Sequence, residues 1–284
     1  MSAGALAVSP RARDIRGPSA FGGGWRRFVD LTWMIGSTNY RLTYFGSALG
    51  YLWSLVRPLL LFGVLYLVFS QVVRFGSGIR DYPVLLLLNI VLFNFFQEAT
   101  GRSVTSVTDN EALVRKMHFP RMVIPLATVL TAALNLLLSL VAVFVFLVAY
   151  GLTPRWQWLL LSLILVALVA FTAAVAMILS SLYVRYRDVA PIWSVLSTVL
   201  FYATPVLYAI EMVPHPWERV VLANPIADLL EQARRWVIDP TAPGAVQAIG
   251  GVEWALIPLA VFAGACALGL WVFDREAPRI AERL

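Results

Sequence analysis

The stretch that decides the fold is residues 45–73, FGSALGYLWSLVRPLLLFGVLYLVFSQVV. It begins with small residues and one charge, Arg57, and then carries no charge from Pro58 to Ser70. Counted from Tyr51, this run is long enough to cross a bilayer core of about 30 Å at a rise of about 1.5 Å per residue. It therefore predicts a membrane-spanning helix with a cation near its start.

The composition extends this prediction to the whole chain. Of the 284 residues, 60% are hydrophobic and 13% are charged, whereas a soluble domain carries roughly 25% charged residues. Further apolar runs lie near 83–102, 122–150, 156–184, 190–210 and 254–273. We expect an all-α membrane protein with six transmembrane helices over 25–284, preceded by a disordered, Gly-, Ser-, Pro- and Arg-rich tail at 1–24.

Residues 25–45 precede the first span and have a different pattern. Polar and basic residues separate the members of an apolar stripe with helical spacing, which is Phe28, Leu31, Ile35, Leu42 and Phe45. This pattern is typical of an amphipathic helix that lies in the membrane interface, although a helix packed on a soluble partner would look the same. Leu49 and Gly50 then form the predicted hinge into the first span.

The basic residues predict the orientation. With six spans, fifteen Arg and Lys residues fall on the side of the two termini and six on the opposite side. Cytoplasmic loops are enriched in Arg and Lys. We therefore expect a multi-pass protein of the bacterial cytoplasmic membrane with both termini in the cytoplasm.

The last external segment, residues 211–252, is too polar for another span and too apolar for a plain loop. Asn224 and Pro225 are a typical cap and first residue of a helix. Its apolar face is expected to lie opposite Asp228, Glu231 and Arg235, and a second short helix is expected at 216–222. The apolar face comprises Ile226, Leu229, Leu230, Ala233, Trp236 and Val237.

Catalysis by this chain is not favoured. Its only lysine, Lys116, does not end a phosphate-binding Gly-rich loop, so no ATP hydrolysis is expected. His118 and His215 lie far apart and Cys266 is the single cysteine, so neither a metal site nor an internal disulfide is expected.

Two sets of polar residues in the spans are predicted to be structural. Glu98 is the single acidic residue well within a predicted span, and we expect it to make a hydrogen bond between helices. Thr128, Thr131, Asn135 and Ser139 form one polar stripe at helical spacing. Such a stripe is usually a contact between helices, and a water- or sugar-lined path is the alternative.

Two further patterns each leave two interpretations open. Residues 105–125 predict a short basic cytoplasmic helix. It is either part of an ordinary loop whose basic residues reflect its cytoplasmic position or a docking element for a cytoplasmic motor, with 185–188 as a second contact.

The first span carries an aromatic stripe at helical spacing. This stripe is more often a packing surface between helices than the wall of a substrate path. Its members are Tyr51, Leu55, Pro58, Phe62, Tyr66 and Phe69.

Five motifs, taken together and in order, resemble the permease subunits of ABC transporters that export polysaccharides, such as O-antigen, capsule and teichoic acid. The resemblance runs from about residue 25 to the C-terminus. The motifs are LGYLWS at 49–54 followed by Pro58, LVRKMHFP at 113–120, YRDV at 186–189, TPVLY at 204–208 and NP at 224–225.

The resemblance implies a permease homodimer that binds ATP-hydrolysing subunits and moves a polysaccharide linked to a polyprenyl diphosphate lipid. ATP and magnesium would bind the partner ATPase, so this chain would hold no cofactor, and no nucleic acid is involved. The implied substrate entrance is Arg41, Leu49, Gly50 and Arg57, and the implied channel lining is Tyr51, Phe62, Tyr66, Phe69, Trp193 and Tyr202. The implied ATPase-coupling residues are Leu113, Arg115, Lys116, Met117, Arg187 and Asp188, and the implied periplasmic gate residues are Asn224, Pro225, Leu229 and Trp236.

Physical chemistry agrees with these assignments without excluding others. Aromatic faces stack on sugar rings, and Arg57 and Arg41 could bind a diphosphate or equally be attracted to anionic lipid. The alternatives are a drug or small-lipid exporter, a membrane enzyme acting on polyprenyl phosphates, and a non-transporting scaffold. Nearly all basic residues of the chain are Arg, and Ala is frequent, which suits a GC-rich genome. Among glycans, this composition points to a cell-wall galactan.

Overall fold

The computed structural model describes residues 24–45, 50, 52–72, 81–116, 120–215 and 217–283, and these residues form helices and connecting turns without any strand. The predicted tail at 1–24 lies outside them except for Gly24. The α-helices are α1 (Trp25–Tyr44), α2 (Leu52–Leu67), α3 (Tyr82–Asp109), α4 (Glu111–Lys116), α5 (Val123–Ala149), α6 (Leu161–Arg185), α7 (Val189–Ala203), α8 (Trp217–Leu222), α9 (Pro225–Val237), α10 (Ala245–Ala248) and α11 (Val252–Arg283). A π-helical turn (Val68–Val72) extends α2, and 3₁₀ turns occupy Trp156–Leu160 and Ile210–Met212.

Five helical segments in the described chain are long and apolar enough to cross a membrane. They coincide with five of the predicted runs, near 51–73, 83–102, 122–150, 156–184 and 254–273, and show that each forms a helix of sufficient length and apolar character to be a candidate span. These segments are Leu52–Ser70, Tyr82–Asp109, Val123–Ala149, Trp156–Arg185 and Val252–Glu276.

The predicted span near 190–210 is shorter than expected. Its helix, α7, has 15 residues and ends at Ala203, which gives about 22 Å at 1.5 Å per residue. Thr204 is extended (φ −88°, ψ 145°) because a following proline, here Pro205, disfavours helical geometry at the residue before it. The count of six spans therefore stays a prediction.

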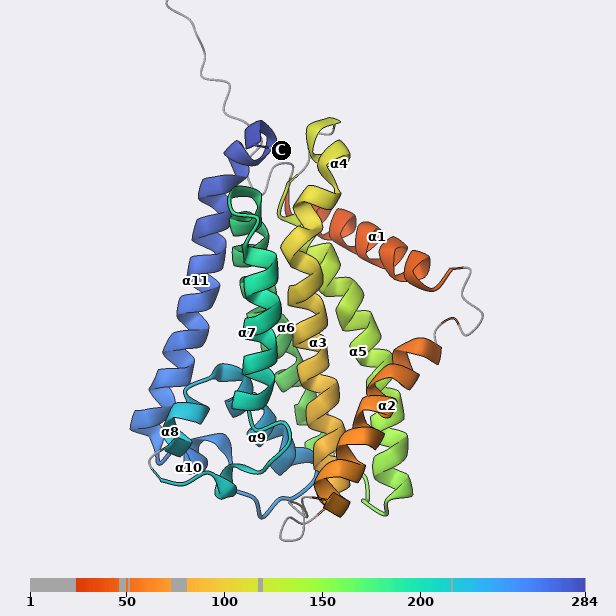
Figure 1. The fold of residues 1–284 in the computed structure, drawn as a ribbon, viewed down its shortest axis with the longest axis vertical. Coiled ribbons are helices and arrows are strands. Elements are labelled where there is room, and N and C mark those ends of the chain that lie inside the picture. Colours follow the sequence, from red (N-terminus) through yellow and green to blue (C-terminus); the bar gives the residue numbers. More distant parts are fainter. Residues whose placement is uncertain are drawn as a thin grey trace, which may run out of the picture.

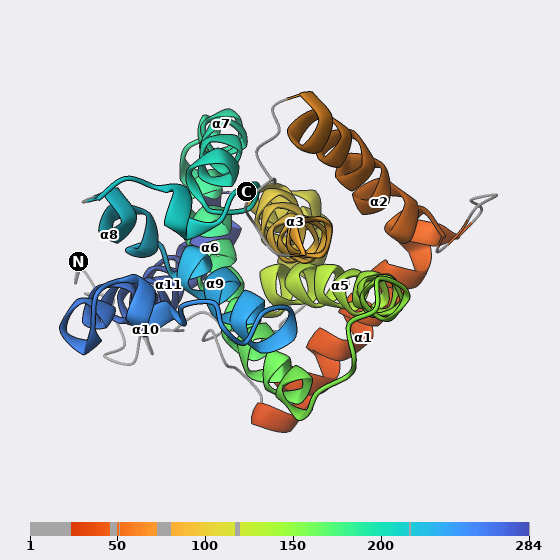
Figure 2. The same ribbon diagram turned by 90° about the horizontal axis from the view of Figure 1, so that it is seen from below.

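α3 is the central helix of the bundle. It packs chiefly against α5 and α6, and α11 packs along α6. Every residue from 84 to 93 is buried, as expected of a helix that is apolar on all sides. Figure 1 shows α8, α9 and α10 at one end of the bundle, with α4 and the C-terminal end of α11 at the other end. Seen along the bundle, α2 and α7 stand on opposite sides of α3 (Figure 2).

The predicted helix over 25–45 is present as α1, which packs along α5. At Gly36 the backbones approach closely, since an added Cβ would lie 3.1 Å from the Ala127 carbonyl oxygen of α5, and the Thr131 hydroxyl donates to the Gly36 carbonyl (3.0 Å). The predicted stripe is only partly right, because its first members pack on protein: Phe28, Leu31 and Ile35. The exposed apolar side chains of this helix are Trp25, Val29, Trp33, Met34 and Leu42, followed by Phe45.

The predicted pair of helices in the last external segment is also present, as α8 and α9. Asn224 caps α9, because its Oδ1 accepts from the Ile226 amide (3.1 Å), and Pro225 is the first residue of the helix. Glu231, which was predicted to lie opposite the apolar face, is nevertheless 3% exposed and pairs with Arg234. The reason is that the turn carrying Glu211 covers this side of α9, and Arg234 bonds to both acids.

Candidate functional site

A groove with a volume of about 1120 Å³ runs along α3 between α2 and α7. The end of α1, the first half of α2, the middle of α3 and parts of α5 and α7 form its wall. Most of the polar lining of α3 lies on one helix face, because the spacings are three or four residues. These residues are Asn94, Gln97, Glu98, Gly101, Arg102 and Thr105.

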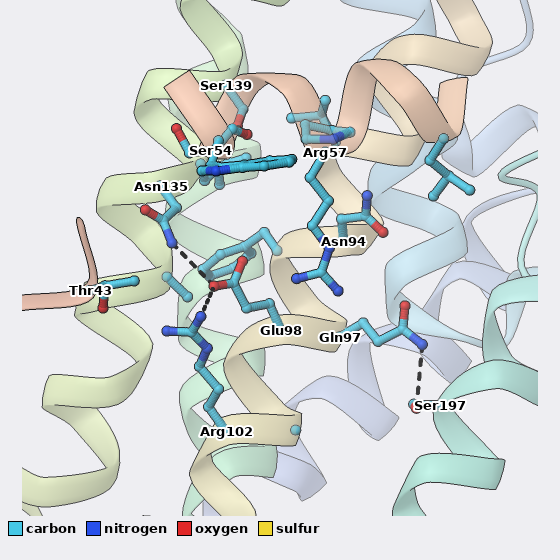
Figure 3. A pocket seen from close by; sticks show the side chains of 18 of the residues that line it. Thr43, Ser54, Arg57, Asn94, Gln97, Glu98, Arg102, Asn135, Ser139 and Ser197 are labelled. Atoms are coloured by element: carbon cyan, nitrogen blue, oxygen red, sulfur yellow. Dashed lines mark hydrogen bonds and ion pairs between the residues drawn. The ribbon is translucent and has the colours of Figure 1, made fainter. Parts of the chain in front are cut away.

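Glu98 is the centre of a polar network that joins three helices (Figure 3). Its Oε1 accepts a hydrogen bond from Asn135 Nδ2 of α5 (3.1 Å) and pairs with Arg102 (3.2 Å). The Tyr44 hydroxyl at the end of α1 donates to Asn135 Oδ1 (2.7 Å). The predicted interhelical hydrogen bond of Glu98 is therefore confirmed, and the carboxylate also lines the groove.

The polar stripe of α5 makes the predicted contacts between helices. Thr131 bonds to α1, Asn135 to α1 and α3, and the Ser139 hydroxyl donates to the Ser54 carbonyl of α2 (3.2 Å). Thr128 instead donates to Ile124 one turn earlier in α5. Asn135 and Ser139 also line the groove, so α5 holds the wall of the groove together and contributes polar atoms to it.

Arg57 is the entrance residue that the structure brings into the groove. Its side chain points into the groove beside Asn94 and Glu98 (Figure 3). Among the described residues it makes no hydrogen bond or ion pair, so its five N–H donors are available to an anion.

Arg41 and Gly50, two further predicted entrance residues, are not among the described residues that line the groove. Arg41 is exposed in the last turn of α1. Gly50 has a φ of 48°, a left-handed conformation that suits glycine and turns the chain from α1 toward α2. Leu49 lies outside the described residues.

The predicted channel aromatics of α2 lie on a different face from the groove. Phe62 stacks on Tyr66 (centroids 5.7 Å apart) and meets Phe146 of α5 edge-on (5.5 Å), and Phe69 packs against the same core. The predicted residue Trp193 does line the groove, together with Trp53 and Phe95, which sequence reasoning missed.

Of the two remaining predicted channel residues, the structure describes Tyr202 and not Tyr51. Tyr202 is 61% exposed and is not among the residues that line the groove, and Tyr51 lies outside the described residues. The channel role of the aromatics stays a prediction.

The two predicted coupling segments lie close together at the α4 end of the bundle. Arg187, in the turn between α6 and α7, donates to the hydroxyl of Thr108 near the end of α3 (3.2 Å) and stacks over Tyr183. Asp188 is exposed beside it, and Leu113 of α4 packs against the core cluster around Met122. The side chains of Arg115 and Lys116, and all of Met117, lie outside the described residues.

At the opposite end, the predicted gate residues join α9 to α7. Asn224 Nδ2 donates to the hydroxyl of Thr204 (3.0 Å), directly after α7. Pro225 is buried, and Leu229 and Trp236 pack half-buried against the main core. The wall helix α7 and the external helix α9 are thereby linked by side chains.

Several groove residues were not predicted. The sequence contained an indication for Asn94 and Gln97, since two amides at a spacing of three residues in an apolar span share one helix face. It contained none for Ser194, Ser197 and Thr198, because hydroxyls in a spanning helix commonly bond to their own backbone. Within the described residues, no cluster of three or more His, Cys, Asp or Glu side chains could hold a metal ion.

Comparison with known proteins gives a consistent match over most of the chain. The family described as "ABC-2 type transporter" matches residues 30–235. "O-antigen export system permease protein RfbA" of Klebsiella pneumoniae is 31% identical over 90% of this chain and 95% of its own length. A protein of the same name from Myxococcus xanthus is 29% identical (85% and 90% covered), and "Polysialic acid transport protein KpsM" of Escherichia coli is 25% identical (69% and 77%).

Proposed function

We propose that this chain, which belongs to the ABC-2 type transporter family, is the permease subunit of an ABC transporter that exports a lipid-linked polysaccharide. The observation that carries the proposal is the match to O-antigen export permeases over 90% of the chain. The polymer would cross the cytoplasmic membrane on a polyprenyl diphosphate carrier. A cell-wall galactan stays our prediction for its sugar.

The groove supports a translocation path. Away from it, the outer faces of α5, α6 and α11 are apolar, as at Val145, Val166 and Leu259. A wall with amide, hydroxyl and charged groups would be costly against lipid chains, which offer no hydrogen bonds. The groove must therefore face water, a polar substrate or a second subunit. A second copy of the chain placed against α2 and α7 would close it into a channel.

The driving force would come from a separate ATPase. The only lysine of the chain is not part of a phosphate-binding loop. We propose that the ATPase docks at the α4 end, where α4 and the turn carrying Arg187 lie close together. This end would be cytoplasmic, because the excess of basic residues lies on that side.

Arg57 would bind the diphosphate of the carrier lipid. A guanidinium forms paired, charge-assisted hydrogen bonds with phosphate oxygens, and this one reaches into the groove close to the end of α1. The substrate could then enter between α1 and α2, where Gly50 turns the chain.

Reconstitution tests the proposal. The permease and an ATPase that co-purifies with it are placed in proteoliposomes with a polyprenyl-diphosphate-linked glycan, and ATP-dependent appearance of the glycan on the far side is measured. We expect Arg57→Ala to lower export at least about tenfold, since one good charge-assisted contact contributes about 1.4 kcal/mol or more. Co-purification of the ATPase should stay unchanged.

Arg155→Ala is the matched control, because Arg155 is an exposed arginine directly before the turn Trp156–Leu160 and is not among the residues that line the groove. Wild-type export by Arg57→Ala would remove Arg57 from the site. Export by the permease without any ATPase would refute the proposed division of labour.

A further inference from the structure

The two sides of the groove differ in charge. Its charged lining residues are Arg57, Glu98 and Arg102, and Figure 3 shows the three side chains converging near the network of Asn135. The opposite side is formed by α7, which has no charged residue between Val189 and Ala203. Among the described lining residues, the cations therefore come from α2 and α3, and none comes from α7.

The α7 side offers uncharged hydrogen-bonding groups. Its residues are Asn94 and Gln97 of α3 with Ser194, Ser197 and Thr198 of α7, and we call this set the α7 wall. Asn94 points into the groove (Figure 3) and makes no hydrogen bond with the described residues. Gln97 makes one long contact to Ser197 (3.5 Å). Both amides therefore keep donors and acceptors for a ligand.

The hydroxyls of α7 complement these amides. Ser197 and Thr198 donate to the backbone carbonyl of Ser194 (3.1 and 3.0 Å). Ser197 is buried and accepts from Gln97, whereas Thr198 is exposed and presents mainly acceptor lone pairs to a ligand. The wall thus combines amide donors with hydroxyl acceptors. A sugar hydroxyl is both a donor and an acceptor and can use both kinds of group.

Trp193 adds a fixed aromatic surface to this wall. Its indole N–H donates to the Thr100 hydroxyl (3.1 Å), and its ring meets Phe96 edge-on (6.1 Å). Since the polar edge of the indole is used in the protein, the ring is held in place and its remaining surface lines the groove. A rigid aromatic surface beside hydrogen-bonding groups is suited to the apolar face of a sugar ring.

The charge of the groove limits its cargo. Among the described lining residues, two guanidinium groups and one carboxylate give a net charge of one positive unit, and Glu98 already pairs with Arg102. Arg57 is therefore the cation of this set that is left for an anionic headgroup. A polymer with a carboxylate on each repeat would place further anions beyond Arg57, against α7, a helix without charged residues, and an unpaired charge out of water is costly.

We infer that the α7 wall is a specificity-determining subsite for an uncharged, polyhydroxylated polymer, and that it disfavours polymers with an anionic repeat. A second copy of the chain would contribute the same charged lining residues, Arg57, Glu98 and Arg102, and its α7 would again carry no charge. This inference rests on the proposed function and narrows its substrate class.

The test compares two glycans in the proteoliposomes that contain permease and ATPase. Both are linked to the same polyprenyl diphosphate and have the same length, but one is neutral and the other carries a uronic acid on each repeat. We expect the wild type to export the neutral glycan at least about ten times faster, a ratio worth about 1.4 kcal/mol. Equal rates, or faster export of the acidic glycan, would overturn the inference.

Variants locate the selectivity. Ser194→Lys places a cation on the wall at an exposed position and should lower the neutral-to-acidic ratio by about tenfold, because opposite charges attract across the groove. Gln97→Ala should slow export of the neutral glycan at least about threefold. ATPase co-purification reports whether each variant is folded, and an unchanged ratio in folded Ser194→Lys would place the selectivity elsewhere.

The outcomes separate this inference from the proposed function. If the wild type exports both glycans equally, only the α7 wall assignment fails. If it exports neither, although its ATPase is bound and active, the proposed function fails. Arg57→Ala should slow export of both glycans equally, because it acts on the shared headgroup.

Discussion

Replacing Arg234 by methionine should strongly destabilise the external end of the molecule. Arg234 is 7% exposed, and its Nη1 lies 2.7 Å from Glu211 Oε2 and 2.9 Å from Glu231 Oε1. Glu211 is half-exposed and can be hydrated instead, but Glu231 is 3% exposed. Removing one partner of a buried ion pair costs about 3–5 kcal/mol, because the other charge is left uncompensated.

The loss should depend on pH. Burial raises the pKa of Glu231 from 4.5 to about 7, against the opposing effect of Arg234, and removing the cation would raise this pKa further. A carboxyl whose pKa is higher in the folded than in the unfolded state destabilises the fold as the pH rises between the two values. The penalty of Arg234→Met should therefore be smaller at pH 6, where Glu231 can be protonated, than at pH 8.

Thermal unfolding in detergent, followed by circular dichroism at both pH values, measures this penalty. A change of 1 kcal/mol shifts the melting temperature of a domain of 150–250 residues by about 2–4 °C, so we expect a drop of about 6–20 °C at pH 8. Arg235→Met is the matched control, since Arg235 bonds to Gln247 (2.6 Å) at an exposed position and should cost about 1 kcal/mol. Equal effects of the two substitutions at both pH values would refute the reasoning.

Three further predictions concern stability and assembly. Burial raises the pKa of Asp228 from 3.8 to about 6, and its Oδ1 accepts no hydrogen bond from the described residues. Stability should therefore fall as the pH rises from about 4 to 6. Asp228→Asn should remove this pH dependence and add about 1–3 kcal/mol of stability at pH 7, and an unchanged pH profile would contradict this. An added Cβ at Gly269 would lie 2.7 Å from a backbone oxygen of α6, whereas an added Cβ at Gly264 would meet no atom within 4 Å. Gly269→Ala should therefore cost about 1–3 kcal/mol of stability and Gly264→Ala nothing, as judged by the melting temperature. Similar melting temperatures for the two variants would argue against this packing of α11 on α6. Charge reversal of Arg115 and Lys116 to Glu should weaken ATPase co-purification, and unchanged pull-down would move the docking surface toward the turn between α6 and α7.

The spanning helices could be predicted from the sequence where apolar residues continue without interruption. α5 occupies almost the whole run predicted at 122–150, since a long apolar segment in a membrane satisfies its backbone most simply as a helix. α7 ended earlier than predicted because hydropathy does not register the effect of Pro205 on the preceding residue. The burial of Glu231 was not predicted, because a carboxylate opposite an apolar stripe is usually solvated, and Arg234, its partner, gave no separate signal.

The candidate site shows a similar limit. Arg57 could be predicted, because a single cation at the start of a spanning helix is conspicuous. Helical spacing correctly grouped Phe62 and Tyr66 on one face, but it could not tell whether that face meets the groove or α5. The α7 wall could not be predicted, since it depends on two helices about 100 positions apart in the sequence.

Site-specific photocrosslinking in cells that synthesise the glycan tests the central claim most directly. A photoreactive amino acid replaces Leu61 in the groove or, as the control, Val166 on the outer face of α6; both side chains are exposed, at 38% and 69%. If the groove between α2 and α7 is the export path, light should attach glycan at position 61 and lipid alone at position 166. Glycan attached equally at both positions, or only at 166, would contradict the account.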